Sequence, residues 1–388
     1  AAPASTPPAH TRLAHMLCHS LLAAQRTPLT PLQRRLIHWF ARAVTTSRYE
    51  IRAGSVEHLV DLCELARHLN TVNLPDDPVL IRQLLDTSER SFSGDIRDPR
   101  KREFVFVLWD RQTQRAIGTS TIIAQLGRRG VPYIYLEVRD EEKYSATLDR
   151  HYIHRVLTTR YSYDGPTELG GLVMHPDCRR SPERLGSLIS YVRFLFIAMR
   201  RGDFRDQTLA ELLPPFEPDG TSLLWEAYGR RFTGLSYREA DLLSKNNKEF
   251  VRSLFPEEIY ATLLSPEAQR VIGEVGADTR GVEKMLRRVG FEYAHRVDPF
   301  DGGPHFTCPT DRVSLVAGAR PLERGTRWNA PGRVLVGRAY SERPYFVAAP
   351  AELERSGGER GDFALPAATL EQLPEEKSVG PAVWIPLA

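Results

Sequence analysis

The sequence lacks several features that define whole classes of protein. No run of apolar residues approaches the ~18 that a membrane-spanning helix needs, so no span is expected. The formal net charge is only +3, too small to indicate a nucleic-acid partner by itself. We therefore expect a soluble globular protein of ordinary composition, whose 388 residues allow a large core and an appendage.

Cysteine is scarce, and its four copies stand far apart along the chain. No two of them share the short spacing of a zinc site or a redox pair, although four thiols could still form two bridges. Isolated thiols are typical of a reducing compartment, so we expect a cytoplasmic protein. His151 and His154 could meet on a helix face, but no third ligand lies near them in the sequence, and no metal site is expected.

Acidic residues are missing from residues 1–48, which carry six arginines. Apolar residues recur there at helical spacing between Leu32 and Val44, and this pattern predicts an amphipathic helix. Two interpretations of this extension stay open. It could be an organelle-targeting peptide or, as we favour, a helix that docks on the main domain or on a partner.

From residue 49 onward the pattern is that of an α+β protein. The first expected elements are a strand, two helices and two strands, over 49–52, 56–68, 77–92, 103–109 and 116–124. Residues 126–166 show no clean periodicity beyond a candidate strand at 131–138. From about residue 314 prolines and glycines become frequent and apolar runs are short. We therefore expect one main domain over 49–313 and a small β-rich subdomain over 314–388.

Two glycines are predicted to end helices. Gly229 and Gly290 each follow a helical stretch and precede an aromatic-led run, and glycine suits the left-handed residue that closes a helix. Short helices are predicted between them over 249–254 and 256–264.

The most informative stretch runs from Glu168 to Ser187 and leads into an apolar helix. It predicts a strand over 167–174, an arginine-rich loop, and a helix over 182–200. Backbone N–H groups at such a helix start have no intrahelical partner and lie at the positive end of the dipole, so they suit a pyrophosphate. Charge from the loop and a glycine for close approach would complete the site, whose candidate residues are Arg179, Arg180, Arg184, Gly186 and Ser187. The alternative is a charged loop that only solubilises a turn.

The order of elements around this loop resembles the GNAT acyl-CoA N-acyltransferase fold. More narrowly, the chain resembles the arginine N-succinyltransferase family over about residues 50–313. The segments that carry the resemblance are Phe104-Val-Phe-Val-Leu, Glu168-Leu, Val173-Met-His-Pro-Asp177, Arg193-Phe-Leu-Phe196, Trp225 to Phe232, Ala240-Asp241, Leu264 to Gly273, Gly290-Phe291 and Phe300-Asp-Gly-Gly-Pro304.

The resemblance implies a mixed, largely antiparallel sheet flanked by helices, with the small β subdomain behind it. It implies transfer of a succinyl group from succinyl-CoA to arginine, with the acyl-CoA as co-substrate and no permanently bound cofactor. It also implies a homo- or hetero-oligomer with a paralogous chain. In that family the residue matching Leu172 contacts succinyl-CoA, and a backbone N–H near Leu172 or Val173 could polarise the thioester carbonyl.

Several side chains could then move protons or hold the amine. Glu168 and Glu211 lie on two strands expected to be neighbours, and either could serve as the base; His175 beside the loop could shuttle protons. The aromatic and turn residues that would face the substrate are Tyr161, Tyr163, Asp301 and Gly302. Each has a plain structural alternative: a strand-end carboxylate, a hydrogen-bonding histidine, a packing aromatic, or a turn that fixes the start of the β subdomain.

The chain departs from its family at the amine side. The family's proton-donor histidine is replaced by Gly276, and its Gly-Asn-Gly phosphate loop reads Arg184-Leu185-Gly186 here. Three hypotheses about the function follow. We favour arginine N-succinyltransferase; the alternatives are a same-fold enzyme for another acyl-CoA or amine, and a catalytically silent subunit that supports an active paralogue.

Overall fold

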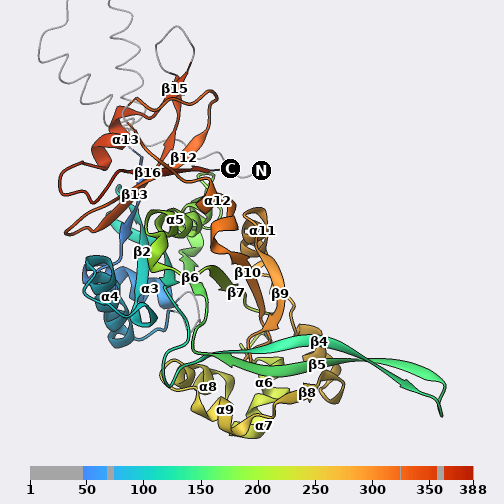
Figure 1. Ribbon diagram of the computed structural model, residues 1–388. Helices are drawn as coiled ribbons and strands as arrows, with labels where there is room; N and C mark the ends of the chain where they lie inside the picture. The colour runs from blue at the N-terminus through green and yellow to red at the C-terminus, as the bar shows by residue number, and fades with distance from the viewer. Residues whose placement is uncertain (1–46, 68–73, 324, 356–361, 388) are drawn as a thin grey trace, which may run out of the picture.

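The computed structural model describes residues 47–67, 74–323, 325–355 and 362–387. The amphipathic segment expected within residues 1–48 therefore lies almost wholly outside the described residues. The described chain forms a 14-stranded sheet in the order β11-β16-β12-β13-β1-β2-β3-β6-β7-β10-β9-β4-β5-β8 (Figure 1). Every neighbouring pair in this sheet is antiparallel except β6 and β7, which run parallel. The expected mixed, largely antiparallel sheet is thus confirmed.

The strands of this sheet are β1 (Tyr49–Ala53), β2 (Glu103–Asp110), β3 (Arg115–Ile123), β4 (Tyr133–Ser145), β5 (Arg150–Ser162), β6 (Thr167–Met174), β7 (Gln207–Glu211), β8 (Glu258–Tyr260), β9 (Glu292–Val297), β10 (Pro304–Pro309), β11 (Arg320–Pro321), β12 (Arg333–Ala339), β13 (Phe346–Glu352) and β16 (Val383–Leu387). A separate pair is formed by β14 (Glu354–Arg355) and β15 (Phe363–Ala364). The α-helices are α3 (Leu59–Arg67), α4 (Pro78–Ser93), α5 (Leu185–Met199), α6 (Leu223–Ala227), α7 (Gly229–Thr233), α8 (Tyr237–Ser244), α9 (Glu249–Leu254), α10 (Pro266–Val271), α11 (Arg280–Arg288), α12 (Ser314–Ala317) and α13 (Ala367–Gln372). Among the described residues, none of these helices has the length and apolarity to cross a membrane.

Local signals explain why α4 begins and ends where it does. Asp77 accepts hydrogen bonds from the N–H groups of Val79 (2.7 Å) and Leu80 (3.2 Å), and Pro78 occupies the first helical position. Gly94 closes the helix with φ of 85°. The helix predicted over 77–92 is therefore confirmed to within a residue, because its caps are local.

The centre of the sheet is covered by helices on both faces. On one face, Phe104 and Phe106 of β2 and Leu169 of β6 pack in the same core as α5, whose residues are mostly buried. Val105 and Val173 alternate to the other face and pack with α3 and α4. Full burial of each such side chain contributes about 1.5–3 kcal/mol, so this two-sided packing fixes which way β6 presents its residues.

The one parallel pair of the sheet, β6 and β7, is joined only over its first residues. Thr167 pairs with Thr208 and Glu168 with Leu209, and no pairing continues beyond them among the described residues. A parallel pair needs a crossover connection, and α5 supplies it between the two strands. The two strands therefore separate towards their carboxyl ends, at the end of β6 where α5 begins.

β6 is irregular in this region. Its register against β3 shifts between Thr119 and Thr121, opposite Gly170 to Val173. Gly171 has φ of 55°, and a Cβ there would lie 2.6 Å from Oγ1 of Thr121. Glycine is required at this position, and the extra residue in β6 turns the backbone near Leu172 out of the regular ladder.

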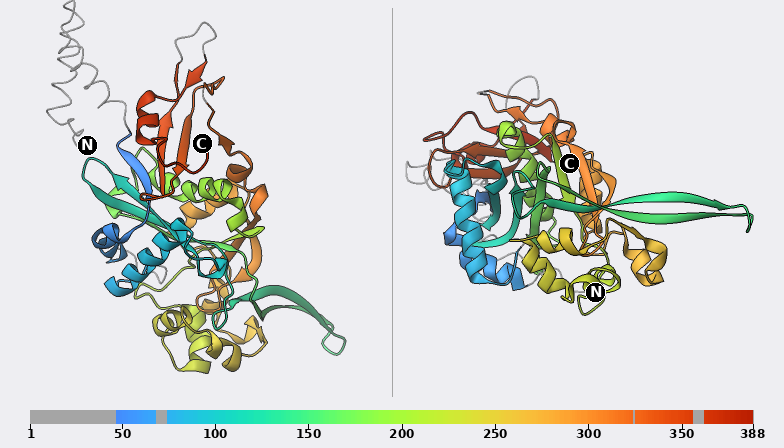
Figure 2. Two further views of the ribbon diagram at one scale, coloured as in Figure 1. Left: turned by 60° about the vertical axis from the view of Figure 1, so that its left-hand side comes forward. Right: turned by 60° about the horizontal axis from the view of Figure 1, so that its bottom comes forward.

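A long β-hairpin, formed by β4 and β5, projects from the body of the molecule (Figures 1 and 2). The sequence predicted only a strand at 131–138 here, because the polar and aromatic outer half of the hairpin has no buried face to create a periodicity. His151 and His154 both lie on β5. They are three apart on a strand, so their side chains point to opposite faces and do not meet as they would on a helix.

The structure also bears on the expectations for Gly229, for residues 256–264 and for the C-terminal strands. Gly229 does not end a helix before a strand; it begins α7, and the Trp225 ring packs so close that a Cβ at Gly229 would lie 2.2 Å from it. Residues 256–264 form β8 and a 3-10 turn rather than a helix. The C-terminal strands are confirmed, but β13 pairs with β1 and so extends the main sheet. A domain boundary at 313–314 stays a prediction.

Replacing Gly229 by alanine is expected to destabilise the protein by about 1–3 kcal/mol, because the new methyl group collides with the fully buried Trp225 ring. Chemical unfolding measures this difference. The control is Gly281→Ala in the exposed first turn of α11, where nothing lies within 4 Å of a Cβ. That change should be neutral or stabilising by up to about 1 kcal/mol. Equal effects of the two substitutions would contradict the packing argument.

Candidate active site

The loop after β6 ends in a helix start that is open to a ligand. Arg184 is the N-cap of α5 in a left-handed conformation (φ 52°) and makes no side-chain cap bond. Its carbonyl accepts from the N–H groups of Ser187 (2.9 Å) and Leu188 (3.3 Å). The first N–H groups of the helix, at Leu185 and Gly186, have no intrahelical acceptor by the geometry of a helix start. They can therefore donate to an anion.

The residues predicted to bind a pyrophosphate gather around this helix start. Arg179, Arg180 and Arg184 are exposed, so their charges face solvent at the carboxyl end of β6. Nothing lies within 4 Å of a Cβ built on Gly186, which leaves room for a ligand against the backbone. The Ser187 hydroxyl lies 3.4 Å from the sulfur of Met285 on α11. The residues predicted to form this site are therefore close together at the start of α5.

A buried arginine lies beneath the irregular part of β6. Arg193 of α5 is only 2% exposed and donates to the carbonyl of Gly170 (3.3 Å) and to the Ser190 carbonyl (3.1 Å) and hydroxyl (2.9 Å). Burial without a carboxylate partner lowers its pKa to about 9. The bond to Gly170 ties α5 to β6 one residue before the left-handed Gly171, and so helps to hold the backbone near Leu172 and Val173.

Glu168 and Glu211 lie on neighbouring strands, as expected, and on one face of the sheet. Glu168 is opposite Leu209, and Glu211 is two residues further along β7, while Leu169 and Ala210 alternate to the face that α5 covers. Burial, reinforced by the like charge of Glu211, raises the pKa of Glu168 to about 8. Burial also raises the pKa of Glu211, whose side chain keeps 30% of its exposure.

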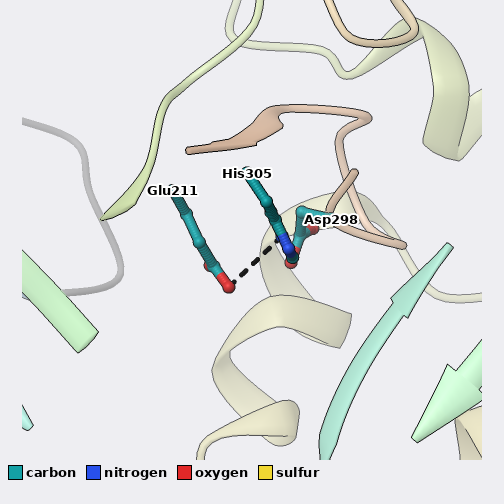
Figure 3. Close-up of side chains that lie close together, drawn as sticks. All are labelled: Glu211, Asp298 and His305. Atoms are coloured by element: carbon teal, nitrogen blue, oxygen red, sulfur yellow. Dashed lines mark ion pairs between the residues drawn. The ribbon is translucent and has the colours of Figure 1, made fainter. Parts of the chain in front are cut away.

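His305 joins this pair from the next strand. It is directly opposite Glu211 in the β7–β10 register and is completely buried. Its Nδ1 lies 3.0 Å from the Tyr133 hydroxyl, whereas its Nε2 is 3.3 Å from Oε1 of Glu211 at an angle that makes no hydrogen bond. Burial lowers the pKa of His305 to about 4, so the ring is neutral near pH 7. One carboxylate oxygen of Glu211, one of Asp298 and one ring nitrogen of His305 all lie within 4.8 Å of one another (Figure 3).

Asp298 of this cluster and one further acidic residue, Asp301, lie on the turn between β9 and β10. Oδ1 of Asp298 accepts from the N–H groups of Phe300 (2.7 Å) and Asp301 (3.2 Å). Asp301 accepts from the Gly303 N–H (2.7 Å) and from the Tyr237 hydroxyl of α8 (3.3 Å). Burial raises the pKa of Asp298 to about 6, and the pKa of Asp301 is also raised. The turn with Asp301 and Gly302 therefore borders the cluster, in the middle of the sheet.

Three predicted residues lie away from this cluster. His175 is seven residues from Glu168 at the other end of β6, roughly 20 Å along the strand, where its Nδ1 accepts from the Asp177 N–H at 3.4 Å. Tyr161 is opposite Ile134, so it points to the face away from Tyr133. Tyr161 and Tyr163 are 54% and 42% exposed and both contact Arg252. Their predicted catalytic and substrate roles are not tested by this placement.

The structure also shows why no side chain stands at Gly276. A Cβ there would lie 2.6 Å from the Pro214 carbonyl oxygen and 2.9 Å from that of Leu213, to which the Gly276 N–H donates. Leu213 and Pro214 follow the end of β7, so Gly276 packs against the segment that comes directly after this strand. The position cannot accept a histidine unless the loop moves.

Sequence reasoning missed Asp298, His305 and Tyr133. Asp298 lies on the turn before β10, His305 on β10 and Tyr133 on β4. They meet because β10 and β9 lie between β7 and β4 in the sheet. The signal that was available is weak: His305 follows the Gly-Gly-Pro turn directly, and Asp298 precedes it by a few residues.

Glu168→Gln tests the buried carboxylate through stability. Because the folded-state pKa of Glu168, about 8, is above its ordinary value of ~4.3, the folded protein loses stability as pH rises between these values. Glutamine carries no charge, so the variant should gain stability relative to the wild type when urea unfolding at pH 8 is compared with pH 5. The exposed Glu142→Gln should change little. A loss at pH 8 would mean that ionised Glu168 is favourably paired.

Comparisons with known proteins agree with this geometry. A family model described as the beta subunit of arginine N-succinyltransferase matches residues 49–315. Curated relatives from Salmonella paratyphi B and Salmonella typhimurium, both named arginine N-succinyltransferase, are each 32% identical over 263 residues, which are 67% of this chain and 75% of theirs. The solved structure of subunit AI of arginine/ornithine succinyltransferase from Pseudomonas aeruginosa is similar with a TM-score of 0.72 at 26% identity, over 88% of this chain and 99% of that one. The matched range contains both the helix start and the acidic cluster, and the chain belongs to the arginine N-succinyltransferase family.

Proposed function

We propose that this protein transfers the succinyl group of succinyl-CoA to the α-amine of arginine, which gives α-N-succinylarginine and free CoA. The observation that carries the proposal is the separation of β6 from β7, with a positively charged helix start at one end and buried Glu168 where the strands still pair. The names of the relatives, arginine N-succinyltransferase and arginine/ornithine succinyltransferase, support a basic amino acid as the amine.

The acyl-CoA half of the mechanism uses the loop and the strand that leads into it. The first N–H groups of α5 and the guanidinium groups of Arg179, Arg180 and Arg184 hold the pyrophosphate. The pantetheine arm then follows β6 from the loop towards Glu168. A backbone N–H near Leu172, turned out of the ladder by the irregularity at Gly171, donates to the thioester carbonyl and stabilises the oxyanion.

The amine half uses the buried carboxylates. Glu168 takes one proton from the substrate ammonium and later releases it to solvent, so that a neutral amine can attack the thioester carbon. The new C–N bond forms as the C–S bond breaks, and the second proton leaves the nitrogen and ends on the thiolate of CoA. Holding the two substrates on either side of the separated strands supplies much of the rate. Glu211 raises the pKa of Glu168 and so makes it a stronger base.

Co-substrates and assembly follow from the same assignment. Acyl-CoA binds and leaves in each cycle, and no permanently bound cofactor is proposed. We propose an oligomer, either of one chain or with a paralogous chain, because the solved relative is a subunit and the family model describes a beta subunit. Substrates of central metabolism and the isolated thiols support a cytoplasmic location, with Cys63, Cys178 and Cys308 free among the described residues.

A second candidate is favoured by one observation. Gly276 packs against backbone carbonyl groups at the position where the resemblance leads us to expect a proton-donor histidine, and this packing leaves little room for such a side chain. A catalytically silent subunit that binds acyl-CoA and supports an active paralogue fits the absence of that side chain. A same-fold enzyme for another acyl-CoA or amine fits it as well.

A thiol-release assay separates these candidates. The purified chain should release CoA from succinyl-CoA when arginine is added, and Glu168→Gln should lower kcat by about 10²-fold or more while folding normally. Glu142→Gln, on the exposed hairpin, is the matched control. Folded protein without turnover on any acyl-CoA and amine pair would leave only the silent subunit, whereas turnover with acetyl-CoA alone would identify another donor.

Gly186→Ala tests the helix start. Because no atom lies within 4 Å of a Cβ there, the substitution should fold well and even stabilise α5 by up to about 1 kcal/mol. The added methyl group nevertheless occupies space that the proposed pyrophosphate needs. We expect the KM for succinyl-CoA to rise about tenfold, with the KM for arginine unchanged. Gly281→Ala serves again as the control, and an unchanged KM in both variants would place the phosphate elsewhere.

A further inference from the structure

We propose that Glu211, Asp298 and His305 form the pocket that holds the cationic side-chain end of the amine substrate, a guanidinium or an ammonium group. This inference rests on the proposed function and deepens it, because it says which residues select a basic amino acid. It assigns a binding role to a cluster that contributes nothing to the acyl-CoA half of the site.

The cluster of Glu211, Asp298 and His305 offers hydrogen-bond acceptors to a ligand. Nε2 of His305 is fully buried, has no hydrogen-bond partner and faces the carboxyl groups of Glu211 and Asp298 (Figure 3). We assign the ring proton of the neutral imidazole to Nδ1, 3.0 Å from the Tyr133 oxygen, and in this tautomer Nε2 presents a lone pair. Two carboxylates and a neutral imidazole within 4.8 Å of one another match a group that has several N–H donors and a positive charge.

Negative charge gathers around this cluster and favours a cationic ligand. Glu168, Asp301 and Asp241 lie close enough to Glu211 for their charges to act on one another, and this like charge adds to burial in raising the pKa of each. Lys248 partly offsets the charge on Glu211. A buried set of carboxylates held together in this way becomes more stable when a cation enters, because the cation favours their ionised forms.

An organic cation fits this pocket better than a divalent metal ion. Oδ1 of Asp298 already accepts two backbone N–H groups, which leaves it fewer lone pairs for a metal. The charges of Lys248 and Arg296 act on His305 and oppose a dication. The Tyr133 ring stacks on the His305 ring at 5.9 Å, with an angle of 25° between their planes, and so helps to hold the imidazole in the orientation in which Nε2 faces the two carboxyl groups.

The spacing also suits one substrate molecule that reaches both groups. Glu211 is two residues beyond Leu209, the partner of Glu168, which is about 6.6 Å along β7. This separation is comparable with the chain of carbon atoms between the α-amine and the cationic end of arginine or ornithine. The α-amine can therefore face Glu168 while the side-chain cation enters the pocket.

The experiment compares charged and neutral substrates with one isosteric variant. Thiol release with succinyl-CoA is measured for arginine, ornithine, citrulline and norleucine, and arginine binding is measured separately by calorimetry. Asp298→Asn keeps the oxygen that accepts from Phe300 and Asp301, so it preserves the turn while it removes the charge. Asp140→Asn on the exposed hairpin is the matched control.

We expect the wild type to prefer arginine over citrulline, and Asp298→Asn to raise the KM and the dissociation constant for arginine about 10- to 100-fold. The KM for succinyl-CoA should stay within about twofold, and the Asp140→Asn control should match the wild type. Glu211→Gln should weaken arginine binding in the same direction.

Three outcomes would overturn the inference. Equal KM values for arginine and citrulline, with normal turnover, would refute the pocket and leave the acyltransferase function intact. Unchanged arginine binding in Asp298→Asn would do the same. A stoichiometric metal in the purified protein that is lost in Asp298→Asn would assign the cluster to a metal ion. If arginine binds and the variant weakens it but no thiol is released, the pocket stands and the proposed reaction fails.

Discussion

The single parallel pairing of β6 with β7 is the constraint on which the site depends. Two adjacent parallel strands cannot be joined by a tight turn, so the chain must cross over, and α5, most of whose residues are buried, makes that crossing along one face of the sheet. The start of the helix therefore lies at the carboxyl end of β6. Because the two strands pair only over their first residues, the same arrangement creates an open end beside the helix start and a closed end at Glu168.

The two faces of the sheet carry different kinds of residue. α5 covers the face that carries Leu169 and Ala210, and it brings the N–H groups and arginines that suit a pyrophosphate. The opposite face carries Glu168, Glu211 and His305, which strand alternation keeps away from the hydrophobic core. Acyl-CoA and amine can approach from different sides and meet between the strands, which is the arrangement that direct transfer without a covalent intermediate requires.

Burial sets the protonation behaviour of the residues on the amine side of the site. Glu168, Asp298 and Asp301 lose solvent without gaining a full set of positive partners, so their pKa values rise, and His305 becomes neutral for the same reason. Such a cluster is unfavourable in the free protein and is relieved by a cation. Gly276, where the resemblance led us to expect a histidine, instead packs against the carbonyl groups of Leu213 and Pro214.

Much of the fold could be predicted because its signals are local. The caps of α4, the apolar run of β2 and the apolar helix α5 are each specified by a few neighbouring residues, and the resemblance carried by Phe300-Asp-Gly-Gly-Pro304 and its companions identified the family. The arginine-rich loop was recognisable for the same reason, since a strand, a loop and a helix that follow one another must be neighbours. Glu168 and Glu211 were expected to be close because the crossover fixes their two strands side by side.

Only the tertiary structure decided the rest. The hairpin of β4 and β5 was missed because its outer half has no buried face, and without a buried face the sequence carries no periodicity. Gly229 was predicted to end a helix because the local sequence does not show that the Trp225 ring packs against this glycine. Asp298, His305 and Tyr133 meet because β10 and β9 lie between β7 and β4, and no local pattern specifies a strand order in which residues more than 170 positions apart become hydrogen-bonded partners. The sequence by itself determined the strand, loop and helix from β6 to α5 and the family, whereas the cluster of Glu211, Asp298 and His305 depends on long-range strand pairing.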